Sequence, residues 1–320
     1  MNIEEITFYC RHEPLAGTLK LPEGARADAP VPIVVQGPGW FGVRDSTHYL
    51  PYHEALVEAG IAVLVFDYHG FGDSKGSSVY FDPADQVLDW HAANDYVVSR
   101  PELDSGRIGA FGLGATGGGN AVMVAAMDPR IKAVVSNVPV ANGRDWLHRM
   151  RREYEWLDLL QRVESDRIQR ATTGQGALVD PNEDVMIQTP ERKTNPVKKN
   201  IEGRSPAQVE LASVGAILRY RPVDVVGSIA PRAFMVVAVE DDATTPEDHA
   251  YQLYESAGEP KSLVVQKKTT HYGAYSDYKE IITPVTVDWF RKYLLDSDID
   301  ILTSEGPAPQ RLFKTRKGTE

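Results

Sequence analysis

The sequence is poor in cysteine, in positive charge and in long apolar runs. Cys10 is the only cysteine among 320 residues, so no intramolecular disulfide can form and no cysteine-based metal site is available. The formal net charge of -11 argues against nucleic acid or an anionic membrane as a partner, because phosphate binding needs clustered positive charge. No stretch has the apolar length of a membrane span, and the polar start MNIEEITFYC is unlike a signal peptide. We therefore expect a cytoplasmic protein.

The chain instead alternates short apolar runs with segments of helix length. Two stretches near the start alternate apolar and polar residues, as half-exposed antiparallel strands do, and the later runs are of the buried parallel type. This strand–helix–strand order predicts an α/β fold with a doubly wound, mostly parallel sheet and helices on both faces. The expected strands cover residues 3–9, 16–21, 33–36, 61–67, 107–111, 133–137, 233–239 and 262–266.

After residue 137 the alternation of strands and helices breaks. A charge-rich helix is predicted over residues 144–170, a polar segment of turns over 171–204, and a second helix over 206–218 with Ser205 as its N-cap. An interruption of this length usually has a function of its own. The expected organisation is an α/β core of residues 1–140 and 222–300, a helical cap or lid of residues 141–221, and a mobile tail of residues 304–320.

The most informative stretch is glycine-rich and reads RIGAFGLGATGGG over residues 107–119. A strand runs into a turn and then into a helix rich in small residues, and only small neighbours let strand and helix approach so closely. A phosphate-binding loop would end in Lys-Ser or Lys-Thr, and this stretch does not. The pattern therefore favours the strand–turn–helix elbow that presents a catalytic nucleophile.

This elbow resembles that of the α/β-hydrolase superfamily, in particular its dienelactone hydrolase and cocaine-esterase or Xaa-Pro dipeptidyl-peptidase-like branches. There the strand ends in Gly-x-Ser-x-Ser/Gly-Gly or the cysteine counterpart. Gly112 matches the first glycine, Gly117 and Gly118 match the closing ones, and the nucleophile position falls on Gly114. Because glycine has no side chain to attack a carbonyl, the usual acyl-enzyme cannot form. Thr116 is the alternative, as a nucleophile in a shifted frame, but it pushes the turn two residues beyond the strand.

The resemblance assigns the remaining members of the site by chain order. Asp242 follows the strand of residues 233–239 and is the expected acid, with Asp241 as second choice; a solvated turn is the alternative for both. His271 follows the next strand and is the expected general base, which a carboxylate partner would orient. The resemblance also implies an oxyanion hole from the backbone amides of Trp40, with Gly39 as alternative, and Ala115.

Aromatic residues suggest where a substrate binds. Trp146 and Tyr154 belong to a stripe of apolar residues spaced three or four apart within the insertion, and Tyr272 follows the expected base. Packing on the core explains the stripe equally well. If the stripe faces the site, the substrate is an apolar or aromatic small molecule. Basic residues beside the stripe form a solvated face, or one of them meets a substrate carboxylate; these are Arg144, His148, Arg151 and Arg152.

Three functions remain open at this point. The first is hydrolysis of an ester, lactone, thioester or amide, with Gly114 in the place of a serine that the natural gene encodes. The second is an enzyme without a covalent nucleophile, in which His271 activates water or moves a substrate proton in carbon–carbon bond cleavage or cyclisation. The third is a ligand-binding protein without catalysis. No metal or organic cofactor is expected, and the habit of the superfamily favours a homodimer.

Overall fold

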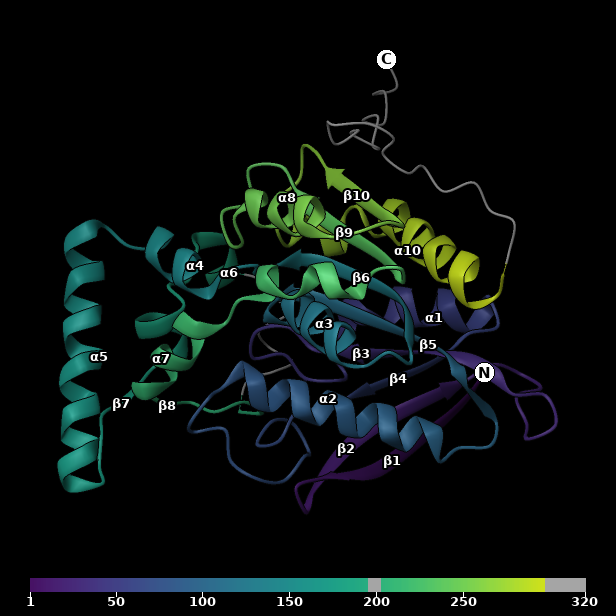
Figure 1. The fold of residues 1–320 in the computed structure, drawn as a ribbon, viewed down its shortest axis with the longest axis horizontal. Coiled ribbons are helices and arrows are strands. Elements are labelled where there is room, and N and C mark those ends of the chain that lie inside the picture. Colours follow the sequence, from purple (N-terminus) through teal and green to yellow (C-terminus); the bar gives the residue numbers. More distant parts are fainter. Residues whose placement is uncertain (195–202, 297–320) are drawn as a thin grey trace.

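The computed structural model describes residues 1–194 and 203–296, and within them an eight-stranded sheet has the order β1-β2-β4-β3-β5-β6-β9-β10 (Figure 1). Two pairs, β1 with β2 and β2 with β4, are antiparallel, and the other neighbours are parallel. The predicted α/β fold is therefore confirmed. The strands are β1 (Asn2–Cys10), β2 (Glu13–Leu21), β3 (Val31–Gly37), β4 (Ala62–Phe66), β5 (Leu103–Ala115), β6 (Ile131–Pro139), β9 (Ala233–Val239) and β10 (Lys261–Gln266).

Helices cover both faces of the sheet, and each face has its own apolar core. On one face, Tyr52, Phe111 and Trp289 lie in a cluster between the sheet and two helices, α1 (Leu50–Glu58) and α10 (Lys279–Leu294). On the other face, Trp90 and Leu253 belong to a larger cluster. The helices of that face are α2 (Pro83–Val98), α3 (Thr116–Met127) and α8 (Glu247–Ser256). Burial on both faces explains why the central strands are almost wholly apolar, as in all of β9.

The chain between β6 and β9 leaves the sheet and forms a separate set of elements, of which α5 is the longest (Figure 1). The single helix expected over residues 144–170 is wrong, because the chain breaks into two helices. The carboxylate of Glu155 accepts the backbone N–H of Arg152 at 2.8 Å, which starts a new helix there. The elements are α4 (Gly143–Arg149), α5 (Glu153–Thr173), β7 (Leu178–Val179), the π-helical turn η2 (Pro181–Val185), α6 (Pro190–Thr194), β8 (Val209–Glu210), α7 (Ala212–Arg219), η4 (Pro222–Asp224) and η5 (Val226–Ile229).

The second helix expected in this region, over residues 206–218, is wrong at its start. The chain is still extended at β8, which pairs antiparallel with β7, and the helix α7 begins only at Ala212. The amide of Glu210 donates to the carbonyl of Val79 at 2.7 Å, a partner far away in the sequence. Such long-range pairing overrides a local capping signal. The polar segment expected over 171–204 contains two helical turns, η2 and α6, and the expected tail from residue 304 lies outside the described residues.

The parallel strands end at one common edge of the sheet. The loops after β3, β5, β9 and β10 therefore meet there, although they are far apart along the chain. Within the described ranges, 1–194 and 203–296, no helix combines the length and the apolar character needed to cross a bilayer. The site is built at this edge.

Candidate active site

The elbow lies between β5 and α3, where strand and helix are in close contact. A β-carbon on Gly112 would lie 1.9 Å from the carbonyl oxygen of Gly117, so only glycine fits there. Two successive residues of the turn have positive φ, Gly114 at 84° and Ala115 at 42° with ψ at −108°. For alanine this backbone is strained, and such strain is typical of functional turns. The elbow is thus formed, and its strained residue is Ala115, one position after Gly114.

Position 114 faces the interior of a pocket. A β-carbon there would lie 3.8 Å from both the Cα of Gly39 and the hydroxyl oxygen of Tyr275, which are ordinary contact distances. Space therefore allows a side chain at this position, and only the positive φ opposes one. Thr116, the alternative nucleophile, is fully buried at the start of α3 and is not among the residues that line the pocket.

The expected acid and base meet at the same edge. The Nδ1 of His271 lies 2.7 Å from Oδ2 of Asp242. The other oxygen, Oδ1, accepts the backbone amides of Thr244 at 2.7 Å and Thr245 at 3.1 Å. Burial acts to raise the pKa of Asp242, but His271 and these two amides outweigh it and hold the pKa below its usual value. Asp241, the second choice, has an exposed position and does not line this pocket.

The other ring nitrogen of His271 has an unexpected partner. Nε2 lies 3.0 Å from the hydroxyl of Tyr275, which belongs to the short helix α9 (Gly273–Ser276). Because Nδ1 donates to Asp242, Nε2 is the acceptor and the tyrosine hydroxyl is the donor. Burial holds the pKa of Tyr275 well above its ordinary value, so this hydroxyl keeps its proton. Asp242, His271 and Tyr275 therefore form one hydrogen-bonded chain that ends beside Gly114.

A second histidine lies against the same tyrosine. The rings of His48 and Tyr275 are stacked at 5.7 Å with 26° between their planes. Burial and, to a smaller extent, the nearby His271 lower the pKa of His48 to about 3, so this ring is neutral at neutral pH. Its Nδ1 is buried and has no hydrogen-bond partner within the described part of the chain. His48 thus fixes the tyrosine ring by stacking without adding charge to the pocket.

The backbone of the β3 loop lies directly on the elbow. A β-carbon on Gly39 would lie 2.5 Å from the carbonyl oxygen of Leu113, and the amide of Gly39 donates to the hydroxyl of Tyr49 at 3.2 Å. Trp40 and Ala115, the two expected oxyanion residues, both line the pocket formed between these segments. The contact between the two backbones therefore brings Trp40 and Ala115 to the same small space.

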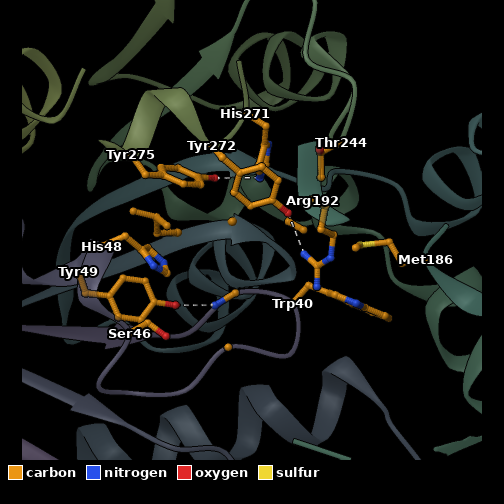
Figure 2. A pocket seen from close by; sticks show the side chains of 15 residues that line it. Trp40, Ser46, His48, Tyr49, Met186, Arg192, Thr244, His271, Tyr272 and Tyr275 are labelled. Atoms are coloured by element: carbon orange, nitrogen blue, oxygen red, sulfur yellow. Dashed lines mark hydrogen bonds between the residues drawn. The ribbon is translucent and has the colours of Figure 1, made fainter. Parts of the chain in front are cut away.

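The pocket has a volume of about 70 Å³ and is lined by the loops at the strand ends together with two residues of the insertion (Figure 2). Of the expected site residues, all but Asp242, Trp146 and Tyr154 are in the lining, and Asp242 lies behind His271. The lining residues are Gly39, Trp40, Gly42, Ser46, His48, Tyr49, Leu113, Gly114, Ala115, Met186, Arg192, Thr244, His271, Tyr272 and Tyr275.

The expected substrate-binding stripe is wrong for two of its members. Tyr154 is 63% exposed on α5 and does not reach the pocket, because the break after α4 turns that face of the chain to solvent. Trp146 is fully buried; its indole N–H donates to the carbonyl of Thr244 at 2.9 Å, and its ring packs edge-on against Trp40. Trp146 therefore supports the site from behind. Tyr272 lies where it was expected, in the wall.

The basic residues beside that stripe do not line the pocket either. Arg151, for example, donates to the carbonyl oxygens of Asp184 at 2.5 Å and Val185 at 2.7 Å, so it holds two parts of the insertion together. The cation in the wall is Arg192 of α6, within a segment expected to be a polar loop. Nothing in the local sequence pattern distinguishes it from its neighbours.

Tyr275 and His48 were also missed, although one signal existed for the tyrosine. It stands four residues after His271, the spacing at which two side chains meet on a helical turn. The helix there has only four residues, too few for a periodic pattern. In the described ranges, no cluster of three or more His, Cys, Asp or Glu side chains could hold a metal ion.

The chain is similar to known proteins in sequence and in fold. The sequence model of the X-Pro dipeptidyl-peptidase (S15) family matches residues 14–273. An uncharacterized 31.7 kDa protein of Escherichia coli is 27% identical over 296 residues, which cover 91% of this chain and 100% of the relative. The quorum-quenching protein AidA of Acinetobacter baumannii is 37% identical over 113 residues, 35% of this chain and 36% of AidA. The fold matches that of the α/β hydrolase GrgF of Penicillium sp. sh18 with a TM-score of 0.74 at 21% identity, over 92% of this chain and 100% of GrgF.

Proposed function

Because the chain belongs to the X-Pro dipeptidyl-peptidase (S15) family, we propose that it hydrolyses a small carbonyl substrate, an ester, lactone, thioester or amide, with water as the attacking group. The observation that carries this proposal is the hydrogen-bonded chain of Asp242, His271 and Tyr275, which ends beside a glycine where the family has a nucleophile. These contacts support a proton-transfer role for the three side chains, and Gly114 offers no side chain that could be acylated.

In this mechanism the proton moves along the chain of side chains. The oxygen of a water attacks the carbonyl carbon while its proton passes to the Tyr275 hydroxyl, whose own proton passes to Nε2 of His271. Asp242 stabilises the imidazolium that forms. The tetrahedral intermediate then collapses, and the same route in reverse delivers the proton to the leaving group.

The negative charge of the intermediate develops on the former carbonyl oxygen. The amides of Trp40 and Ala115 are the proposed donors, since both residues line the pocket on either side of Gly114. Such preorganised donors stabilise an oxyanion by roughly 3 kcal/mol each. Residues 141–221 act as a lid that excludes bulk water, because Met186 and Arg192 of this segment complete the pocket wall.

The substrate is proposed to be apolar or aromatic around its carbonyl group. Trp40, Met186 and Tyr272 offer apolar surface around the space beside Gly114. Pockets of this kind fix the orientation of a ligand through a few polar groups in an otherwise apolar wall.

The absent nucleophile also favours a second candidate. The same base could remove a proton from carbon or oxygen of the substrate and so promote carbon–carbon bond cleavage or cyclisation without any acyl-enzyme. The products separate the two: hydrolysis consumes water and releases an acid together with an alcohol, thiol or amine.

The test is turnover by the chain as it stands. We expect hydrolysis of 4-nitrophenyl acetate or of an S-butyryl thioester above the buffer rate, and a fall of about 10²–10⁴-fold in kcat for His271→Gln. Asp277→Asn, a change at an exposed residue outside the pocket, is the matched control and should retain full activity. A folded protein that hydrolyses neither substrate, or that is equally active without His271, contradicts the proposal.

A further inference from the structure

Arg192 is the cation of the pocket wall (Figure 2). It lies on α6 of the insertion, and one of its terminal nitrogens donates to the hydroxyl of Tyr272 at 2.9 Å. The other donates to the side-chain oxygen of Asn182 at 3.2 Å. Its Nε is buried and has no hydrogen-bond partner within the described part of the chain. A guanidinium has five N–H donors, so two contacts leave three of them available.

The charge of Arg192 is not balanced by a carboxylate among residues 1–194 and 203–296. Several other half-buried arginines pair with a carboxylate: Arg44 pairs with Asp67, and Arg170 pairs with Asp166 at 2.8 Å. Arg151 and Arg232 have no carboxylate partner within the described residues either, but backbone carbonyls accept hydrogen bonds from both.

Within the described residues, both hydrogen-bond partners of Arg192 are neutral side chains, so no carboxylate there forms an ion pair with it. A charge in a partly buried wall is unfavourable unless a counter-charge accompanies it. Within the pocket, Asp242 cannot serve, because its two oxygens are already engaged by His271 and by the turn of Thr244 and Thr245. The counter-charge is therefore expected to come from a ligand.

We infer that the substrate carries a carboxylate, which Arg192 binds while the carbonyl to be hydrolysed lies beside Gly114. This inference rests on the proposed hydrolase function and names its substrate class: a half-ester, half-thioester or half-amide of a dicarboxylic acid, with an apolar or aromatic remainder. A carboxylate fits because Nε and a neighbouring terminal nitrogen present two parallel N–H groups to its two oxygens. A phosphate would bring close to two negative charges to a single cation.

The first arm of the test measures binding and needs no turnover. Anilides of succinic, glutaric and adipic acid, each with a free carboxylate, are titrated calorimetrically against the corresponding neutral amides. For at least one chain length we expect the anion to bind about tenfold or more tightly than the neutral partner. Arg192→Gln removes this difference and leaves the weaker binding of the neutral compound unchanged, whereas Arg192→Lys retains part of it because the charge stays and the fork is lost.

A matched control separates this effect from a general loss of lid charge. Arg167→Gln makes the same change on α5, where Arg167 pairs with Glu164 at 2.6 Å on the exposed surface, and it should leave the preference for the anion intact. Thermal unfolding of each variant establishes that the fold is retained. Equal binding of anion and neutral amide, an unchanged preference in Arg192→Gln, or tighter binding of phenyl phosphate than of every carboxylate overturns the inference.

The second arm measures turnover and separates the two proposals. The mono-4-nitrophenyl ester of glutaric acid should exceed 4-nitrophenyl butyrate in kcat/KM, and Arg192→Gln should abolish this advantage mainly through KM. Turnover with no preference for the anionic ester contradicts the carboxylate inference, whereas the proposed hydrolase function stands. Anion binding that depends on Arg192 in a protein without turnover contradicts the hydrolase function, whereas the carboxylate-binding site stands.

Discussion

The two walls of the pocket are held in place by different means. On the core side, Asp242 engages His271 and the turn of Thr244 and Thr245 through four hydrogen bonds at the ends of two strands. On the insertion side, Met186 follows a five-residue turn and Arg192 lies in a five-residue helix. Arg151 joins the first of these elements, η2, to α4 through backbone carbonyls of both. If the proposed roles hold, catalytic groups lie on the wall built from strand ends and specificity groups on the wall built from short insertion elements, a division that enzymes commonly use.

The largest loss of activity is expected from a change at the proposed proton carrier of the core wall. Tyr275→Phe deletes the hydroxyl that donates to Nε2 of His271 and leaves the ring stacked on His48. We expect kcat to fall about 100-fold with KM little changed, since a relay acts on the reaction step rather than on binding. Steady-state kinetics check this result. A rise in activity would indicate instead that the Tyr275 hydroxyl blocks access to Nε2 of His271.

A gain of function, the introduction of a nucleophile, also tests the core wall. Gly114→Ser should give a burst of one acyl group per protein with 4-nitrophenyl acetate, because a β-carbon fits at position 114 beside the Tyr275 hydroxyl. The positive φ of 84° should lower the free energy of unfolding by about 1–2 kcal/mol. Stopped-flow kinetics and thermal unfolding measure the two effects. A folded variant without a burst would contradict the proposal that a side chain at position 114 can pass its proton to Nε2 of His271.

The pH dependence of stability reports on the acid of the core wall. The folded-state pKa of Asp242 is lowered from 3.8, so its contribution to stability is full above the unfolded pKa and is lost as pH falls through the folded value. We expect Asp242→Asn to lower Tm near neutral pH, and the difference from the parent to shrink on acidification below about pH 4. A Tm difference that stays constant over this pH range would show that Asp242 stabilises the fold through packing and not through its charge.

Much of the core wall could be predicted from the sequence, because short segments of it carry recognisable patterns. The buried run of β9 and the glycines at 112 and 117 are each dictated by close packing of neighbouring segments. Chain order along a parallel sheet then brings Asp242 and His271 to the same edge, and they lie 2.7 Å apart. Their catalytic roles stay predictions.

The insertion could not be predicted in the same way. Apart from α5, its elements carry too few residues for a periodic pattern, and distant partners such as Val79 decide where some of them begin. The spacing that grouped Tyr154 with Trp146 assumed one continuous helix, and the break between α4 and α5 removed the basis for that grouping. Arg192, in contrast, could be recognised only in three dimensions, where it lines the pocket and pairs with no carboxylate among residues 1–194 and 203–296.

The smallest expected effect separates the two aromatic residues that the sequence had grouped together. Tyr154→Ala changes a side chain that is 63% exposed, so kcat/KM and stability should move by no more than about 0.5 kcal/mol, a factor of about two. Trp146→Ala empties a fully buried site behind Trp40 and should lower the free energy of unfolding by about 3–5 kcal/mol. Denaturant unfolding and esterase assays on both variants provide the measurement. If Tyr154→Ala instead raised KM for an aromatic ester several-fold, α5 would have to close over the pocket during turnover, and the insertion would move as a lid rather than stand as a fixed wall.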